Sequence, residues 1–395
     1  LLMMIKEARL YIQQGEPATR SACTGGFTEK VPPGLSGLFT RNTHFRRLQP
    51  EEIIEFKDDT LRPTYTCTLR LVTGDDLDAH GLMASGFQRD ELEWEARNFK
   101  ARIAPMLIGV DAFDREFIWQ RLWYAQRFLY TGRQLLDTVD GMLWDLAVRQ
   151  ARMPLYQLLG GCRERVPAYQ CIDGDSIDEL VAAAVNAKEA GFKGAKDHSY
   201  RGVRANIELA RQMRAAVGDD FLLLHDPVEN YTCEEALQVG RELERQNYTW
   251  MEEPLQDHDM MGLKKLCDSL DLPILAMEWV GYVGGQPFSA APYLALGAAD
   301  IIRQRAIGIT GQLKLAQLCE SFGVEVHGGN PHVTLAIGND PLYETGRAIP
   351  LADDAELDCR GTLVVDEGYM TIASNSNPVS EPDWDEMERT ALAVI

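Results

Sequence analysis

The chain has 395 residues, of which 45% are hydrophobic and 25% charged, and its formal net charge is −21 with a pI of about 4.8. This length favours a large core and two domains, and the negative charge argues against nucleic acid or an anionic membrane surface as a partner. We identify no apolar run long enough to span a bilayer and no signal peptide. The eight cysteines form no C-x-x-C pair, which favours a reduced, cytoplasmic setting.

The region 1–133 predicts an α+β domain. Residues 4–12 and 65–73 alternate between apolar and polar as strands do. Between them, a segment of about 13–62 rich in Gly, Pro, Thr and Arg is typical of a lid or binding loop, although a merely mobile surface loop gives the same pattern. Two amphipathic helices are expected to follow, at 89–104 and 111–129.

The region 134–345 begins with a helix at 134–151 and then alternates between β and α patterns. The connection at 329–340 is too short for a full helix, so we expect a modified (β/α)7β barrel. The remaining residues, 346–395, contain a further strand pair that we expect to return to the first domain as part of an α+β cap. The predicted strands are 166–170, 194–198, 221–226, 250–254, 274–278, 300–304, 324–328 and 341–344. The predicted helices are 177–190, 202–216, 233–245, 259–269, 287–297 and 310–322.

Three acidic residues stand at the ends of successive apolar runs. Asp226, Glu252 and Glu278 are separated by 26 residues each, about the length of one strand, one helix and two loops. In a barrel, these carboxylates would meet at the C-terminal face, where such folds keep their chemistry. Their mutual repulsion calls for a cation, and hard oxygen ligands favour Mg²⁺.

Residues that can move protons end the neighbouring strands. Lys196 and His198 are two apart on the second strand and share a face, while His327 ends the seventh strand and Glu344 the eighth. Taken singly, a strand-end histidine is more often structural. Together with the metal carboxylates, these residues suit removal of the α-proton of a carboxylate, with a base on one face and an acid or second base on the other.

These motifs resemble the enolase superfamily and, within it, the mandelate racemase subgroup. The resemblance extends over nearly the whole chain, through TVDGMLWDLAVRQARMPLYQLLGG, GFKGAKDH, LLLHDPVENY, YTWMEEPL, LPILAMEW, GITGQLKLAQLCESFGVEVHGGNP and DPLYETG. It implies that Asp226, Glu252 and Glu278 bind Mg²⁺.

The resemblance also implies roles for the proton-moving residues. The usual Lys-x-Lys motif of strand two is here Lys196-Asp197-His198, so Lys196 would contact the substrate carboxylate and His198 would take the place of the base. His327 would be the base or acid of the opposite face, and Glu344 would hydrogen-bond the enolate oxygen.

The end of strand six departs from the family pattern. The family usually places an Asp there as the partner of the strand-seven histidine, but this chain has Arg303 and Arg305. An arginine could bind an anionic substrate, and it would favour the neutral form of His327. Glu325 shares a strand face with His327 and is a candidate for the missing orienting partner.

The first metal strand departs too. The family often has Asn two residues after the metal Asp, where this chain has Val228. Substrate contacts there are expected from Asn230 or Tyr231 instead. In the lid segment, His44 and Arg41 are candidates for substrate contact.

The function these features favour is the Mg²⁺-dependent dehydration of a sugar acid to a 2-keto-3-deoxy acid. The unlike groups on the two faces and the polar lid favour dehydration. A racemase, epimerase or cycloisomerase would use the same chemistry, and a non-catalytic descendant could keep the fold. We also expect a homo-oligomer that binds a small anionic substrate.

Overall fold

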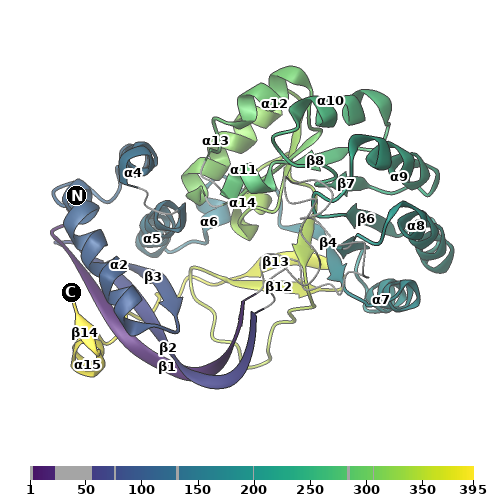
Figure 1. Cartoon of the computed structure of the whole chain (residues 1–395). Coiled ribbons are helices and arrows are strands. Elements are labelled where there is room, and N and C mark those ends of the chain that lie inside the picture. Colours follow the sequence, from purple (N-terminus) through teal and green to yellow (C-terminus); the bar gives the residue numbers. More distant parts are fainter. Residues whose placement is uncertain are drawn as a thin grey trace.

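The computed structural model describes residues 3–22, 56–74, 77–129, 133–198, 200–282, 285–305 and 307–395. Most of the predicted lid, including Arg41 and His44, lies outside these residues, so its predicted substrate contacts stay predictions. Figure 1 shows two parts, a cap built around a twisted sheet and a larger ring of strands covered by helices.

The cap sheet has the strand order β14-β1-β2-β3. Its long strands, β1 (Glu7–Ala22) and β2 (Phe56–Val72), pair antiparallel from Glu7 opposite Val72 to Ala22 opposite Phe56. The strands therefore continue well into the segment predicted to be a lid loop. The sequence there has no clear strand pattern, but pairing between the two strands supplies the backbone hydrogen bonds. The flanking strands are β3 (Ala79–Gly86) and β14 (Ala393–Val394).

Helices cover one face of this sheet. Alternate residues Ala8, Leu10 and Ile12 of β1 are fully buried and pack with Leu92 and Phe99 of the first helix. Among the described residues, no helix combines the length and the apolar character needed to cross a membrane. The helices of the cap and of its junction with the barrel are α2 (Arg89–Arg102), α3 (Ala104–Leu107), α4 (Arg115–Leu129), α5 (Arg133–Ala151), α6 (Leu155–Leu158) and, near the C-terminus, α15 (Trp384–Thr390).

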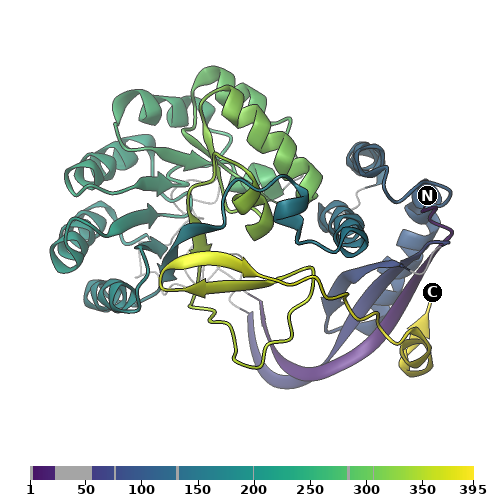
Figure 2. The ribbon, with the colours of Figure 1, turned by 180° about the vertical axis from the view of Figure 1, so that it is seen from behind.

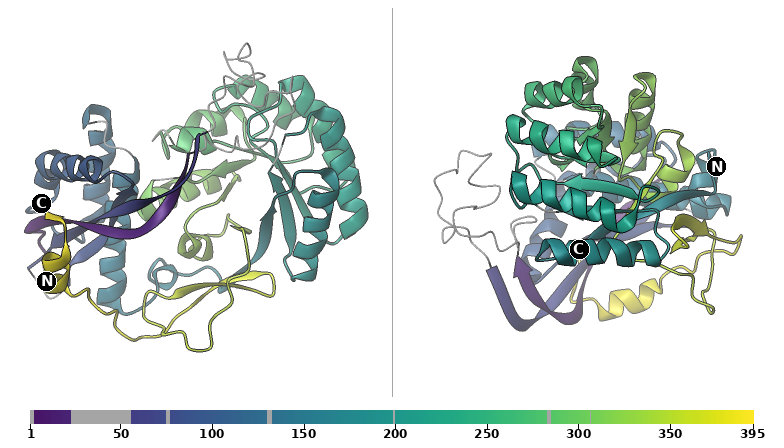
Figure 3. Two further views of the ribbon diagram at one scale, coloured as in Figure 1. Left: turned by 60° about the horizontal axis from the view of Figure 1, so that its bottom comes forward. Right: turned by 90° about the vertical axis from the view of Figure 1, so that its right-hand side faces the viewer.

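The second part is a ring of parallel strands with helices on its outside, as Figure 3 shows in its left view. The strands follow chain order around the ring, and β11 pairs with β4. No ladder joins β10 to β11 in the described residues, but the N–H of Val326 donates to the carbonyl of Asn339 at 2.9 Å across this gap. The strands are β4 (Arg165–Ile172), β5 (Gly194–His198), β6 (Leu222–Asp226), β7 (Trp250–Glu252), β8 (Ile274–Ala276), β9 (Ile301–Arg303), β10 (Glu325–His327) and β11 (Tyr343–Thr345).

The outer helices follow the predicted pattern closely. Helix α9 (Cys233–Arg245) occupies the predicted residues because a capping box of Thr232 and Glu235 fixes its start. The short connection between β10 and β11 holds one helix, α14 (Pro331–Ala336). The others are α7 (Ile177–Glu189), α8 (Val203–Val217), α10 (Met260–Ser269), α11 (Glu278–Tyr282), α12 (Ala290–Leu296) and α13 (Gly308–Ser321).

The C-terminal tail divides between the two parts, as Figure 2 shows. Its first two strands, β12 (Thr362–Asp366) and β13 (Tyr369–Ala373), form a hairpin, and β13 pairs antiparallel with the start of β4. The tail reaches the cap from Glu381 onward, where Trp384 of α15 stacks on Tyr11 and β14 pairs with β1. The expected return to the cap therefore applies to the last residues and not to the strand pair, because Val365 and Met370 bury their side chains in the barrel core.

Candidate active site

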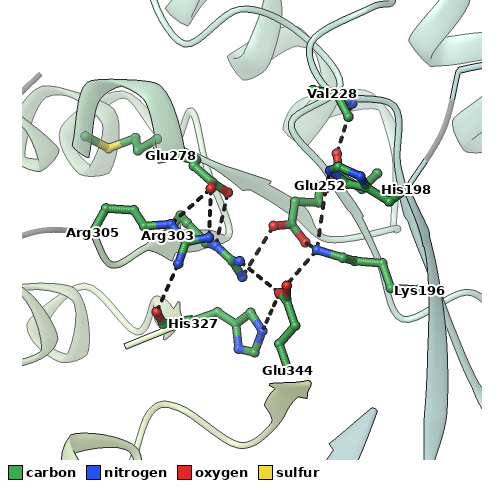
Figure 4. Close-up of polar contacts among 12 residues, drawn as sticks. Lys196, His198, Val228, Glu252, Glu278, Arg303, Arg305, His327 and Glu344 are labelled. Atoms are coloured by element: carbon green, nitrogen blue, oxygen red, sulfur yellow. Dashed lines mark hydrogen bonds and ion pairs between the residues drawn. The ribbon is translucent and has the colours of Figure 1, made fainter. Parts of the chain in front are cut away.

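The second strand of the ring carries two of the predicted residues on its inner face. Lys196 Nζ and His198 Nε2 each lie 3.4 Å from Oδ2 of Asp226 on the neighbouring strand (Figure 4). The Lys196 side chain is 2% exposed and that of His198 is 41% exposed. Lysine therefore occupies the floor of the site, and histidine occupies its open edge.

The outward-facing residue between them fixes the orientation of this strand. Asp197 is buried, and its Oδ1 lies 2.8 Å from Nδ1 of His225 on β6. The other ring nitrogen of His225 lies 2.8 Å from the hydroxyl of Tyr231. Because strand residues alternate between faces, this outer network holds Lys196 and His198 toward the inside.

Glu252 is fully buried in the floor of the site. Its Oε2 accepts a hydrogen bond from Lys196 Nζ at 2.8 Å, and its Oε1 lies 3.4 Å from Nη1 of Arg303. Burial alone would raise the pKa of Glu252, but Arg303 and Lys196 outweigh it and lower that pKa to about 2. This carboxylate is therefore ionised at every physiological pH.

Glu278 follows β8 and forms ion pairs with both Arg303, at the end of β9, and Arg305. Arg303 Nε lies 3.2 Å from Glu278 Oε2, while Nε and Nη2 of Arg305 donate to Oε1 at 3.0 and 2.7 Å (Figure 4). Both arginines line a cavity of about 220 Å³ together with His327 and Glu344. They therefore reach the site and pair with its acids; their contact with substrate stays a prediction.

Glu344 joins the two sides of the site. Its Oε2 lies 3.2 Å from Lys196 Nζ and 2.8 Å from Arg303 Nη2. Burial opposes ionisation, but Lys196 and Arg303 hold the pKa of Glu344 well below its usual value. Burial likewise opposes the charge of Lys196, but Glu252 and Glu344 hold the pKa of Lys196 well above its usual value. In this state Glu344 is an acceptor, and Lys196 is a permanent cation.

His327 lies on the opposite side of the site and is buried. Its Nδ1 lies 3.2 Å from Oδ1 of Asp340, and Asp340 Oδ2 accepts a hydrogen bond from the hydroxyl of Thr334 at 2.7 Å. Its Nε2 lies 2.8 Å from the hydroxyl of Tyr169. The orienting partner of His327 is therefore Asp340, and not Glu325, whose side chain is exposed to solvent at the other end of β10.

The carboxylates of the predicted metal ligands lie close to one another, because pairs of them contact the same basic side chain. Asp226 and Glu252 both approach Lys196, and Glu252 and Glu278 both approach Arg303. Burial and the neighbouring carboxylates raise the pKa of Asp226 to about 6. A divalent cation would reverse this shift, so the donor set of three convergent carboxylates fits Mg²⁺ chemically. Their role as ligands stays a prediction.

A second group of acids lies beside this set. Glu229, Glu253 and Asp257 are buried and place carboxylate oxygens within 4.8 Å of one another. Asp257 accepts the backbone N–H groups of Met277 and Val280 at 2.6 and 2.9 Å, so it fixes the start of the segment that carries Glu278. Asp257 therefore has a structural role in placing the site.

Asn230 does not line the cavity around Arg303 and His327. Its amide nitrogen donates to the carbonyls of Pro227 and Val228 at 2.8 and 3.0 Å, so the side chain stabilises its own loop. The hydroxyl of Tyr231 bonds to the network behind β6. A substrate contact by Asn230 stays a prediction.

The sequence reasoning missed three residues of the site. Tyr169 and Cys171 point inward from β4 and donate to the two oxygens of Glu344 at 2.9 and 3.2 Å. Their alternation in VPAYQCI was the available signal. Asp340 lies in the connection just before β11, away from the C-terminal strand ends where chemistry was sought, so its position concealed it.

Two family models match the chain. The model described as enolase C-terminal domain-like matches residues 179–376, and the N-terminal domain of mandelate racemase and muconate lactonizing enzyme matches residues 69–160. The first match covers most of the ring and the hairpin of β12 and β13, and the second begins within β2 and includes most of the cap helices.

Curated relatives include both dehydratases and epimerases. The L-talarate/galactarate dehydratase of Salmonella typhimurium is 30% identical over 263 residues, which are 61% of this chain and 64% of that protein. The L-Ala-D/L-Glu epimerase of Clostridium acetobutylicum is 27% identical over 248 residues, 62% of this chain and 66% of that protein. The matches thus span slightly less than two thirds of these relatives.

Among solved structures, the D-glucarate dehydratase of Agrobacterium tumefaciens complexed with magnesium has the same fold. Its TM-score is 0.72 at 24% identity, and the match covers 100% of both chains. This likeness, at low identity, extends the shared fold to the cap and the tail.

Proposed function

Because the chain belongs to the family of mandelate racemase and muconate lactonizing enzymes, we propose that it dehydrates a sugar acid. The reaction removes the proton α to the carboxylate and expels the β-hydroxyl as water, leaving a 2-keto-3-deoxy acid. The observation that carries this proposal is the contrast between His198 and His327. One imidazole is open to solvent and the other is buried against Asp340 and Tyr169.

The unlike surroundings give the two histidines different roles. His198 can take the α-proton at Nε2, which lies at the open edge of the site. Lys196 keeps its charge beside Glu252 and Glu344, so it donates hydrogen bonds to the substrate carboxylate and does not act as a base. His327 then gives a proton to the departing hydroxyl, so the C–O bond breaks as the new O–H bond forms and water leaves.

The residues that would hold a metal are Asp226, Glu252 and Glu278. Bound between them, Mg²⁺ supplies positive charge that stabilises the negative charge developing on the substrate carboxylate. The buried, ionised state of Glu252 supports its place in this set.

The protein has a net charge of −21, so an anionic substrate needs local positive charge in the site. Arg303 and Arg305 supply such charge. Arg305 is the more accessible, with a side chain that is 24% exposed against 2% for Arg303. We expect Arg305→Met to weaken substrate binding by about tenfold, the loss of one charge-assisted hydrogen bond. An unchanged affinity would make Arg305 a structural partner of Glu278.

The test of the function is a screen of acid sugars in the presence of Mg²⁺. Release of a 2-keto acid, detected as its semicarbazone, is expected for at least one hexonate, pentonate or aldarate. His327→Asn is the matched control, because it removes the proposed acid and leaves the carboxylates. If no sugar acid yields a keto acid, the dehydratase proposal fails.

An epimerase is the second candidate, because the site has an imidazole on each side. Incorporation of solvent deuterium at the α-carbon with inverted configuration, and without keto-acid release, would identify that activity. Assembly as a homo-oligomer and a cytoplasmic location remain part of the proposal; size-exclusion chromatography with light scattering tests the first.

A further inference from the structure

Two arginines of the strand-six segment point into the site (Figure 4). Arg303 ends β9 and Arg305 follows two residues later, so an extended backbone places both side chains on the inner face. Within the described residues, the ladder between β8 and β9 ends at Ala276 opposite Ile302. After β8 the chain turns away at Met277, which has a φ of 81°. A group other than a neighbouring strand must therefore hold the backbone from 303 to 305 on this side.

The side chain of Gln286 fills that position. It is fully buried, its Nε2 donates to the carbonyls of Met277 at 3.2 Å and Arg303 at 2.5 Å, and its Oε1 accepts the backbone N–H of Arg305 at 3.2 Å. A primary amide offers two N–H donors and one acceptor oxygen, so all three contacts can form together. This amide clamp joins the end of β8 to the strand-six segment with the hydrogen bonds that a paired strand would supply.

The surroundings leave little freedom to the clamp and to the segment that it holds. A side chain at Gly281 would meet Cβ of Arg305 at 2.8 Å and Nε2 of Gln286 at 3.1 Å, so the backbone there packs directly against both. On the other edge of the segment, the N–H of Gln304 donates to the carbonyl of His327 at 2.8 Å. The segment is thus held from both sides, and on the side of β8 the holding group is the amide of Gln286.

The cap anchors the main chain that carries this amide. The indole N–H of Trp123 donates to the carbonyl of Gln286 at 3.1 Å, and that of Trp119 donates to the carbonyl of Ile307 at 2.7 Å. The two tryptophans are four residues apart on α4 and therefore lie on one face of this helix. Phe288 packs edge-on against Trp123, with ring centroids 4.6 Å apart. Helix α4 therefore holds the chain on both sides of the arginines.

We propose that Gln286, anchored by Trp123, is a positioning residue that directs Arg303 and Arg305 into the site. Both arginines line the cavity of about 220 Å³, whereas Gln286 acts on them through their backbone. The inference deepens the proposed function and rests on it for one part, the binding of an anionic substrate by Arg305. The clamp itself is a statement about hydrogen bonds within the chain, and it can be tested without a substrate.

Hydrogen–deuterium exchange of the full chain, read residue by residue with mass spectrometry, tests the clamp. Gln286→Met keeps the length of the side chain and removes its amide, so the N–H of Arg305 loses its acceptor. We expect this N–H to exchange about fivefold faster or more, the effect of losing a buried hydrogen bond on local opening. Unchanged exchange at Arg305 overturns the inference.

Arg214→Met is the matched control. Arg214 is buried, and its guanidinium donates to the carbonyls of Phe221 and Asn247 at 2.8 Å each, in the connections that precede β6 and β7. These connections lie at the end of the barrel opposite the site. Exchange at Arg305 should therefore be unchanged in this variant, and an equal acceleration would assign the effect to general destabilisation and overturn the inference.

A milder variant tests the anchor in the cap. Trp123→Phe removes the indole N–H that bonds to the carbonyl of Gln286 and keeps an aromatic ring against Phe288. Exchange at Arg305 should rise, but by less than in Gln286→Met. If Gln286→Met does not fold, Trp123→Phe decides the question, and an unchanged rate at Arg305 then overturns the inference.

A double-variant cycle separates positioning from a merely structural role. With the sugar acid that the screen identifies, Gln286→Met should raise KM by about tenfold, as we expect for Arg305→Met, with a smaller change in kcat. The double variant should be no worse than Arg305→Met alone, because the clamp acts on the substrate through this arginine. Effects that multiply, or a fall in kcat at unchanged KM, would make Gln286 structural and overturn the inference. Since the exchange measurement needs no substrate, failure of the dehydratase proposal is distinguishable from failure of the clamp.

Discussion

The two sides of the site hold the same side chain in opposite surroundings. His198 is open to solvent and contacts one acid, whereas His327 is buried and bonded at both nitrogens. An imidazole with a free edge can receive a proton from a substrate and lose it to water. An imidazole enclosed by Asp340 and Tyr169 is shielded from water and held in one orientation. The difference in exposure between the two histidines gives a physical reason why this site could favour loss of water over exchange of the α-proton alone.

The largest effect is expected from the open side. His198→Asn removes the proposed base and should lower both keto-acid formation and α-deuterium exchange by about 10³–10⁴-fold. Parallel assays of the two reactions in deuterated buffer measure this. Exchange at the normal rate in the variant would show that the base lies elsewhere.

The buried side should behave differently when its histidine is lost. His327→Asn is expected to lower dehydration by about 10²–10³-fold while α-deuterium exchange continues, because the acid acts after the α-proton has left. Magnesium binding, measured by calorimetry, should stay close to normal. Loss of exchange in this variant as well would make His327 a base and remove the contrast between the two sides.

A substitution of Asp340 tests the contact that orients His327, without removing either histidine. Asp340→Asn keeps the shape of the side chain but removes the charge beside Nδ1, so dehydration should fall by about 10–100-fold with little change in KM. Glu325→Gln, at the exposed end of the same strand, is the control and should be near normal. Equal losses in both variants would contradict the assignment of Asp340.

A third histidine, His332, gives the smallest expected effect. Burial lowers the pKa of His332, on α14, to about 4, and its Nδ1 accepts the backbone N–H of Tyr156 at 3.3 Å. Its folded pKa lies below the unfolded value near 6.5, so its contribution to stability is present above about pH 6.5 and is lost as pH falls toward 4.

Since His332 is partly exposed, we expect about 1–2 kcal/mol over this pH range. Chemical unfolding of the unaltered chain and of His332→Gln at pH 7 and pH 4.5 measures the difference. The stability gap between the two pH values should be smaller in the variant. Identical gaps would mean that His332 does not titrate with unfolding.

The sequence by itself determined the features that depend on local pattern. The strand at 194–198 and the helix at 233–245 occupy the predicted residues, because a short buried run and a capping box are local signals. The equal spacing of Asp226, Glu252 and Glu278 likewise predicts that they lie at one end of the ring, since each βα unit has about the same length.

Only the tertiary structure decided which side chains meet across the ring. Tyr169 reaches Glu344 over 175 residues. Arg303 turns inward to Glu252 of β7, to Glu278 after β8 and to Glu344 of β11. Asp340 reaches His327 because the chain crosses from β10 to β11 through one short helix. These contacts depend on the curvature and register of the ring, and the local pattern of apolar and polar residues specifies neither. The sequence therefore predicted the candidate acids and bases, while the closure of the ring fixed which side chains they contact.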